Sequence, residues 1–210
     1  QGRMSVIIIY LIVFVLLLAA ELFYFRIADR FNIIDKPNER SSHNYITIRG
    51  GGVIWWVAAL LYLLFNLSVT AGWFLAGITL IAGVSFVDDV KGLGQKMRLL
   101  FHLLAMSCAF YLAGVFGSYP WWAIVIGYVV FIGIVNAYNF MDGINGITGL
   151  YSIAVLASLQ YVNLSYGNFV PPDLIWYPMI ASLVFLFFNF RKRARCFAGD
   201  VGSVTIAFWI

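Results

Sequence analysis

Apolar residues run along this chain in long blocks that short polar segments separate. A block of roughly 20 apolar residues, wound as a helix, crosses a hydrocarbon core of about 30 Å. The blocks therefore predict an all-α fold, a polytopic bundle of about eight transmembrane helices. The predicted spans lie near residues 4–25, 51–67, 70–87, 99–117, 121–138, 147–163 and 174–190, with an eighth that begins at residue 201.

The last of these blocks stops at Ile210 after ten residues, too few to cross a bilayer. We therefore expect residues 1–210 to form a single integral-membrane domain that is a C-terminally truncated piece of a longer protein. The first block has an apolar core longer than the roughly 7–15 residues of a signal peptide, and no small-residue cleavage site follows it. It predicts a retained helix.

Composition agrees with a membrane location. Of the 210 residues, 63% are hydrophobic and 10% are charged, whereas soluble domains have about 45–50% and about 25%. Of the two cysteines, Cys108 lies in a predicted span and Cys196 in a basic loop. Neither their spacing nor their location indicates a disulfide or a metal site.

Basic residues mark one side of the predicted bundle. Twelve of the 13 lie in residues 26–49, 91–98 and 191–195, whereas the alternate connections hold none. Because short cytoplasmic loops carry the excess of Lys and Arg, we predict that these segments face the cytoplasm and that the N-terminus lies outside. This topology accounts for the net charge of +4. The lipid bilayer, and not nucleic acid, is therefore the expected partner.

Carboxylates gather on the same predicted side. Asp88 and Asp89 end the third span, Asp142 follows the fifth span, and Asp200 opens the eighth. These residues are far apart in sequence but share one predicted membrane depth, so a helix bundle can bring them together. Ionisable groups at a membrane face are typical of a functional site, which predicts an active site at the cytoplasmic face.

Each polar feature also has a structural interpretation. Asp200 could cap the start of its helix or complement the helix dipole. The acidic pair could be a solvated helix end whose charges are balanced by Lys91 and Lys96. Asn136 and Asn139 could form hydrogen bonds between helices. These interpretations weaken when the features are taken together.

Two adjacent carboxylates repel each other, so a nearby cation or base favours their charged forms. Mg²⁺ takes one or two carboxylates and fills its remaining positions with water and phosphate oxygens, and Mn²⁺ could replace it. Basic residues at the same surface, among them Lys96 and Arg98, bind phosphate. The chain has neither a Walker lysine motif nor a Cys/His metal spacing. A magnesium-assisted transfer between phosphates is the reaction that fits these residues.

Four motifs follow one another along the chain: DKPNERSSHNYITIRGGG, DD with GLGQKMRLL, NAYNFMDGINGITG and FAGDVGS. Together they resemble those of the polyprenyl-phosphate N-acetylhexosamine-1-phosphate transferases, over a stretch from Asp35 to Ser203. The resemblance implies transfer of an N-acetylaminosugar 1-phosphate from a UDP-sugar to undecaprenyl phosphate, with release of UMP. It also implies a place in the bacterial cytoplasmic (inner) membrane, where the product would start a cell-envelope glycan such as O-antigen or capsule.

The resemblance implies roles for individual residues as well. Asp200 corresponds to the Mg²⁺ ligand. The pair Asp88 and Asp89 would handle magnesium and diphosphate or deprotonate the lipid phosphate, which makes both catalytic and Asp88 a second metal ligand. The other predicted site residues lie near nucleotide, metal or phosphate; they are Asp142 as a catalytic residue, and Asn136, Asn139, Asn145, Lys96, Arg98 and His43 as substrate-binding residues.

The chain departs from the family pattern at some positions. Asn145 stands where many members have Asp, so a carboxylate role does not transfer, and TIRGGG replaces a segment that often contains proline. His43 is equally compatible with a solvated loop histidine. The family's histidine-bearing loop would lie beyond Ile210, so the aminosugar stays open, as does a homodimer.

A membrane transporter or channel fragment is the alternative function. Transporters bind their substrates near the bilayer midplane on broken helices. The carboxylates of this chain lie at one predicted face instead, which favours an interfacial enzyme.

Overall fold

A computed structural model describes residues 2–35 and 45–210, with side chains from residue 5 onward. Helices account for every apolar block, which confirms the predicted all-α class. The helices are α1 (Gly2–Phe31), α2 (Val53–Phe65), α3 (Val69–Lys91), α4 (Gln95–Leu112), α5 (Val115–Ser118), α6 (Trp121–Met141), α7 (Ile147–Tyr166), α8 (Asp173–Asn189) and α9 (Gly199–Trp209). Two short strands, β1 (Ile34–Asp35) and β2 (Thr47–Ile48), pair antiparallel between α1 and α2.

Within the described residues, four helices are long and apolar enough to cross a membrane: α1 (from Ser5), α3, α6 and α7. The helices α2 and α8 are apolar but shorter. The chain is therefore a multi-pass membrane protein. The eight crossings and the cytoplasmic orientation stay predictions.

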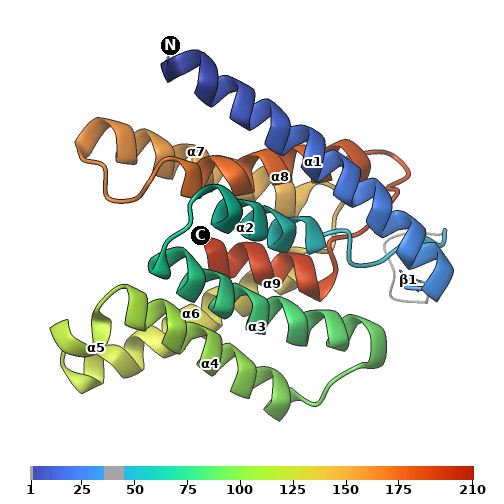
Figure 1. Cartoon of the computed structure of the whole chain (residues 1–210). Coiled ribbons are helices and arrows are strands. Elements are labelled where there is room, and N and C mark those ends of the chain that lie inside the picture. The colour runs from blue at the N-terminus through green and yellow to red at the C-terminus, as the bar shows by residue number, and fades with distance from the viewer. Residues whose placement is uncertain (1, 36–44) are drawn as a thin grey trace.

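The helices α8 and α9 form the centre of the bundle. α9 packs against α2, α3 and α6, and α8 packs against α1, α2 and α7, an arrangement visible in Figure 1. Buried polar groups join these layers, because the Trp55 Nε1 of α2 donates a hydrogen bond to the Ser182 Oγ of α8 at 3.0 Å. Such a bond fixes the register between two helices that apolar packing alone would leave free to slide.

The periphery of the bundle is apolar and exposed. Little of α6 is buried, and large side chains such as Val129 and Ile134 lie open on its surface. Exposed apolar helices are stable in a hydrocarbon solvent, where every backbone polar group is satisfied within the helix. The fold therefore requires the membrane that the composition predicts.

The polar connections meet at one end of the bundle. There α3 and α8 end, α4 and α9 begin, and β1 lies beside the end of α1, at the right of Figure 1. We call this end the basic face, because its described segments carry Arg26, Arg30, Arg49, Lys91, Lys96, Arg98, Arg191, Lys192, Arg193 and Arg195.

Backbone hydrogen bonds join the β-hairpin to the segment that leads into α9. Ile48 forms a parallel bridge with Cys196, and the Phe197 N–H donates to the Ile48 carbonyl at 2.8 Å. The Gly51 N–H returns a bond to the Phe197 carbonyl at 2.8 Å. Residues 47–52 and 196–198 are thus held side by side, although almost 150 residues separate them in sequence.

Candidate functional site

Glycines bring the start of α2 against the start of α9. A Cβ added to Gly52 would collide with the Cα of Gly202, so no larger residue fits at this contact without moving backbone. Gly50, two residues earlier, has a φ of +81°, a conformation that residues with a Cβ rarely adopt. The GGG of the first loop is therefore what lets the loop reach the α9 motif.

Asp89, in the last turn of α3, binds the first turn of α9. Its carboxylate accepts hydrogen bonds from the backbone N–H of Asp200 at 3.0 Å and of Val201 at 2.9 Å. It also pairs with the Arg49 Nε at 2.8 Å, and its side chain is fully buried. The first N–H groups of a helix have no partner within the helix, so Asp89 caps α9 from another helix and its negative charge interacts favourably with the positive end of the α9 dipole.

Asp88 points to a different neighbour. Its carboxylate pairs with the Arg98 Nη1 at 3.1 Å and accepts a hydrogen bond from the Leu93 N–H in the turn before α4. The other Arg98 nitrogen, Nη2, lies 3.7 Å from the Asp200 carboxylate. Arg98 therefore bridges the end of α3 and the start of α9.

Asp200 lies between two guanidinium groups and two carboxylates. The Arg49 Nη2 is 4.0 Å from the Asp200 Oδ1, on the side opposite to the Arg98 contact with Oδ2. Burial, the negative charge of Asp89 and a hydrogen bond with Asp88 together raise the pKa of Asp200 to about 6, against the effect of the two arginines, which lower it. Three acidic groups at this point are thus not fully neutralised by two basic ones.

Asp142 follows α6 and faces the same group of charges. Burial raises the pKa of its carboxyl to about 6, against the effect of a hydrogen bond from the Thr148 hydroxyl at 2.6 Å. The charges of Asp89 and Arg49 also act on it, which places the α6–α7 turn beside the acidic end of α3. The structure therefore brings the four predicted carboxylates to one face.

The α6–α7 turn is tied to the loop before α9. The buried Asn189 side chain accepts a bond from the Gly146 N–H at 2.6 Å and donates to the Cys196 carbonyl at 2.8 Å. Gly146 has a φ of +88°, and a Cβ there would collide with the Phe190 ring. One amide thereby fixes two of the four motifs relative to each other.

The predicted substrate-binding residues differ in their surroundings. Asn139 accepts a hydrogen bond from the Ser203 hydroxyl of α9 at 2.9 Å, and Asn145 donates to the Arg191 carbonyl at 2.9 Å. Asn136 lies one turn before Asn139 on α6, and Lys96 is exposed at the start of α4. The prediction for His43 lies outside the described residues. All of these roles stay predictions.

Three residues that position the site escaped the sequence analysis: Arg49, Asn189 and Ser203. Arg49 lies in the TIRGGG segment. The departure of this segment from the family pattern is the sequence feature that could have drawn attention to Arg49. Ser203 belongs to the FAGDVGS motif, but its contact with Asn139, like the contacts of Asn189, arises from tertiary packing that no sequence pattern indicates.

The described residues contain no group of three or more His, Cys, Asp and Glu side chains that could hold a metal ion. What they offer is the pair Asp88 and Asp200, whose carboxylates share Arg98 and interact with each other. Mg²⁺ is commonly bound through one or two carboxylates, with water and substrate phosphate completing its shell. The donor set therefore fits magnesium better than it fits a metal that needs a closed protein cage.

Comparison with known proteins identifies the family of the chain. The family model of glycosyl transferase family 4 matches residues 71–210, more than half of the chain, and the match includes α3, the α6–α7 turn and α9. The chain belongs to glycosyl transferase family 4. The family resemblance that the four motifs indicate is thereby confirmed.

Several curated members of the family are similar to the chain. The probable undecaprenyl-phosphate N-acetylglucosaminyl 1-phosphate transferase of Bacillus subtilis (strain 168) is 28% identical over 204 residues, which cover 88% of this chain and 55% of that protein. The undecaprenyl-phosphate alpha-N-acetylglucosaminyl 1-phosphate transferase of Yersinia pestis is 28% identical, with 99% of this chain and 62% of that protein covered. The phospho-N-acetylmuramoyl-pentapeptide-transferase of Streptococcus suis (strain 05ZYH33) is 32% identical, with 75% and 54% covered. The chain thus spans 54% to 62% of the length of these relatives.

Proposed function

We propose that the full-length protein transfers an N-acetylaminosugar 1-phosphate from a UDP-sugar to undecaprenyl phosphate and releases UMP. The product would initiate a lipid-linked cell-envelope glycan. The observation that carries this proposal is the position of Asp200, which lies between Arg49 and Arg98 and beside the acidic end of α3. Family membership and the names of the relatives support the same reaction and favour it over a transporter.

Asp88 and Asp200 are the residues that we assign to Mg²⁺. Their carboxylates face each other across Arg98, and the raised pKa of Asp200 indicates that the pair would gain from a further positive charge. When bound, Mg²⁺ would supply that charge and polarise a phosphoryl group of the substrate. Mn²⁺ has similar ligand preferences and could serve in its place.

The two arginines are suited to phosphate. Each guanidinium offers five N–H donors in a planar fork that matches phosphate oxygens. Arg49 and Arg98 are partly exposed, at 37% and 29% of their side chains, so both can bind a substrate phosphate while they remain close to the carboxylates. Asn139, whose side-chain oxygen accepts the Ser203 bond, would present its amide N–H groups to the nucleotide.

Asp142 is suited to accept the proton of the acceptor phosphate. A phosphate monoester has its second pKa near 6, and burial brings the pKa of Asp142 to about 6 as well. Proton transfer between groups of similar pKa is efficient. The Asp89 carboxylate, which is fully occupied by Arg49 and two backbone amides, would act by positioning Asp200.

The acceptor also needs a place for its polyprenyl tail. Directly after Arg98, the α4 surface carries Leu99, Leu100 and Leu104, which are 46% to 48% exposed. Since the tail is already in hydrocarbon, burial against these side chains would position it more than it would drive binding. The apolar start of α4 thus lies next to the phosphate-binding arginine.

The test uses the purified full-length protein with Mg²⁺ and labelled UDP-N-acetylglucosamine or another UDP-aminosugar. UMP should be released only when undecaprenyl phosphate is present. Asp200→Asn should lower the rate by roughly 10²-fold or more, because it removes a charge where transition-state charge develops. Asp173→Asn, which removes a carboxylate at the opposite end of α8, should keep the rate within a few-fold of the parent protein.

Three results would overturn the proposal. UMP release that does not depend on the lipid would indicate a hydrolase. Near-normal transfer by Asp200→Asn would leave this residue as a structural feature of the α9 start. No release with any UDP-aminosugar, together with solute uptake into proteoliposomes, would indicate the transporter.

A further inference from the structure

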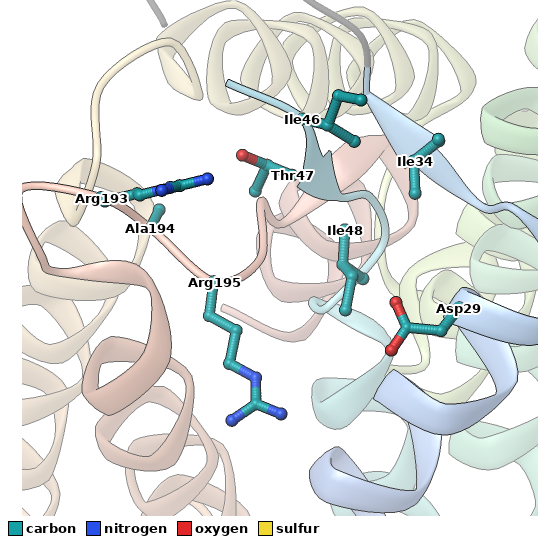
Figure 2. Close-up of a pocket in the computed structure, with 8 residues that line it drawn as sticks. All are labelled: Asp29, Ile34, Ile46, Thr47, Ile48, Arg193, Ala194 and Arg195. Carbon is teal, nitrogen blue, oxygen red and sulfur yellow. The ribbon is translucent and has the colours of Figure 1, made fainter. Parts of the chain in front are cut away.

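A hollow opens on the basic face, beside the proposed transferase site. Its volume is about 400 Å³, within the range of roughly 300–1,000 Å³ that ligand sites occupy. Figure 2 shows Arg193 and Arg195 on one side, Ile46 and Ile48 in the centre, and Asp29 of α1 on the other side. The acidic residues of the proposed transferase site do not line it.

The two arginines of the hollow are held by aromatic rings. The Arg195 guanidinium lies over the Phe25 ring at 4.9 Å, and the Arg193 guanidinium lies over the Tyr45 ring at 5.1 Å. Such contacts orient a guanidinium but leave its N–H groups available. Among the described residues, neither arginine forms an ion pair with a carboxylate. Both donors are therefore ready for an anion.

The lining also carries one acceptor. Within the described part of the chain, the exposed Asp29 carboxylate has no ion pair either. Two positive charges against one negative charge leave the hollow electropositive. A ligand that satisfies all three groups would carry one negative charge for the arginines and hydroxyl groups for Asp29, since an ionised carboxylate only accepts hydrogen bonds.

The rim of the hollow carries exposed apolar residues. Ile46 of the lining is 59% exposed, and on α1, which contributes Asp29, Phe31 is 68% exposed. Farther back on α1, Phe23 is 63% exposed. Basic pockets with such a rim at a membrane surface are suited to lipid head groups.

We propose that this hollow binds the head group of an anionic phospholipid, phosphatidylglycerol. The phosphodiester lies against Arg193 and Arg195, the head-group hydroxyls donate hydrogen bonds to Asp29, and the acyl chains leave over Ile46 toward the exposed surface of α1. The proposal is independent of the transferase reaction.

The walls of the hollow are also the segments that hold the site. Ile48 of the hollow precedes Arg49, which pairs with Asp89, and Arg195 precedes Cys196, which bridges to Ile48. A bound head group would therefore tie the hairpin to the segment before α9. Binding should appear as a rise in thermal stability, since a ligand of the folded state stabilises it by mass action.

The experiment titrates short-chain phosphatidylglycerol into the purified full-length protein in neutral detergent and follows the melting temperature. The melting temperature should rise saturably with phosphatidylglycerol and not with phosphatidylcholine. Inorganic phosphate should need at least a tenfold higher concentration than phosphatidylglycerol for the same rise in melting temperature. Phosphatidylmethanol, which lacks the head-group hydroxyls, should need at least a threefold higher concentration. Arg193→Gln with Arg195→Gln should raise the half-saturating concentration at least tenfold.

Lys192→Gln is the matched control, because it removes the same charge from the same loop outside the lining; its half-saturating concentration should change by less than twofold. Asp29→Asn should abolish the preference for phosphatidylglycerol over phosphatidylmethanol. If the double variant does not fold, Arg193→Gln alone, whose ring contact is with Tyr45 at the surface, should still raise the midpoint several-fold.

An equal effect of Lys192→Gln and Arg193→Gln would reduce the proposal to general surface charge and overturn it. Competition between UMP and the lipid would assign the hollow to the nucleotide and overturn it as well. The titration does not depend on transfer. A saturable lipid effect in a protein that releases no UMP in the separate transfer assay would therefore refute the proposed function and leave this site standing.

Discussion

Asp89→Asn is the substitution that separates a positioning role for Asp89 from a chemical one. Asparagine keeps the size of the side chain and one acceptor oxygen, but it loses the charge and replaces the second oxygen with a donor. That donor would face a backbone N–H of α9, either that of Asp200 or that of Val201. The start of α9 should therefore loosen.

The magnitude follows from the contacts of this buried carboxylate. A hydrogen bond to a charged group contributes about 1.5–3 kcal/mol, and one of the two amide bonds is lost. The ion pair with Arg49 adds no more than about 1 kcal/mol, because the Arg49 side chain is 37% exposed and solvent screens the pair. The free energy of unfolding should fall by roughly 2–4 kcal/mol, and the melting temperature should fall with it.

The assay combines the melting temperature of the purified full-length protein with amide hydrogen exchange. In Asp89→Asn, the amides of Asp200 and Val201 should exchange faster than in the parent protein. Asp88→Asn is the control, because the Asp88 carboxylate contacts Arg98, the Leu93 amide and the Asp200 side chain, and not the backbone N–H groups of α9. It should leave the exchange of the Val201 amide unchanged.

The reasoning would be refuted by an Asp89→Asn protein with the parent melting temperature and unchanged exchange at residues 200 and 201. In that case the two amides do not depend on the carboxylate. A loss of transfer activity in such a protein would then have to come from chemistry at Asp89 itself.

Two further substitutions test the packing and the electrostatics of the site. Gly52→Ala should lower the melting temperature and the transfer rate, because its Cβ would collide with Gly202. Overpacking of this kind costs about 1–3 kcal/mol or more. Gly83→Ala is the control and should change neither quantity, because a Cβ at Gly83 meets no atom within 4 Å. Thr148→Val should raise the pKa of Asp142 above its value of about 6, because it removes the hydroxyl that stabilises the charged carboxylate. The acid limb of the rate–pH profile should therefore move to higher pH, and an unmoved limb would show that Asp142 does not set it.

The helices could be predicted from the sequence, but their ends could not. The apolar block near 70–87 predicts a span that Asp88 and Asp89 end, whereas α3 continues past them to Lys91 and carries both acidic residues on its last turn. Polar residues at a membrane surface can extend a helix or end it, and hydropathy does not distinguish the two. The predicted span at 99–117 is divided in the structure at Gly114, whose φ is +67°, because a left-handed residue cannot continue a right-handed helix.

The clustering of the four site carboxylates could be predicted from the sequence, because each of them follows or precedes an apolar block on the same predicted side of the membrane. The partners of those carboxylates were not. Arg49 reaches Asp89 only because β2 is bridged to Cys196, and Asn189 joins two motifs through backbone groups that any residue would possess. Contacts of this kind depend on the packing of distant segments, and one sequence carries no periodic signal for them.

The acidic pair shows how sequence adjacency can mislead. Residues that follow each other on an α-helix point about 100° apart, because one turn holds about 3.6 residues. Asp88 and Asp89 both lie on the last turn of α3, so their carboxylates cannot approach one ligand from the same direction. One carboxylate meets Arg98 and Asp200, while the other meets the backbone N–H groups that open α9. The doublet therefore places an acidic group beside Asp200 and also fixes the helix on which Asp200 lies, and these two tasks require two carboxylates that diverge.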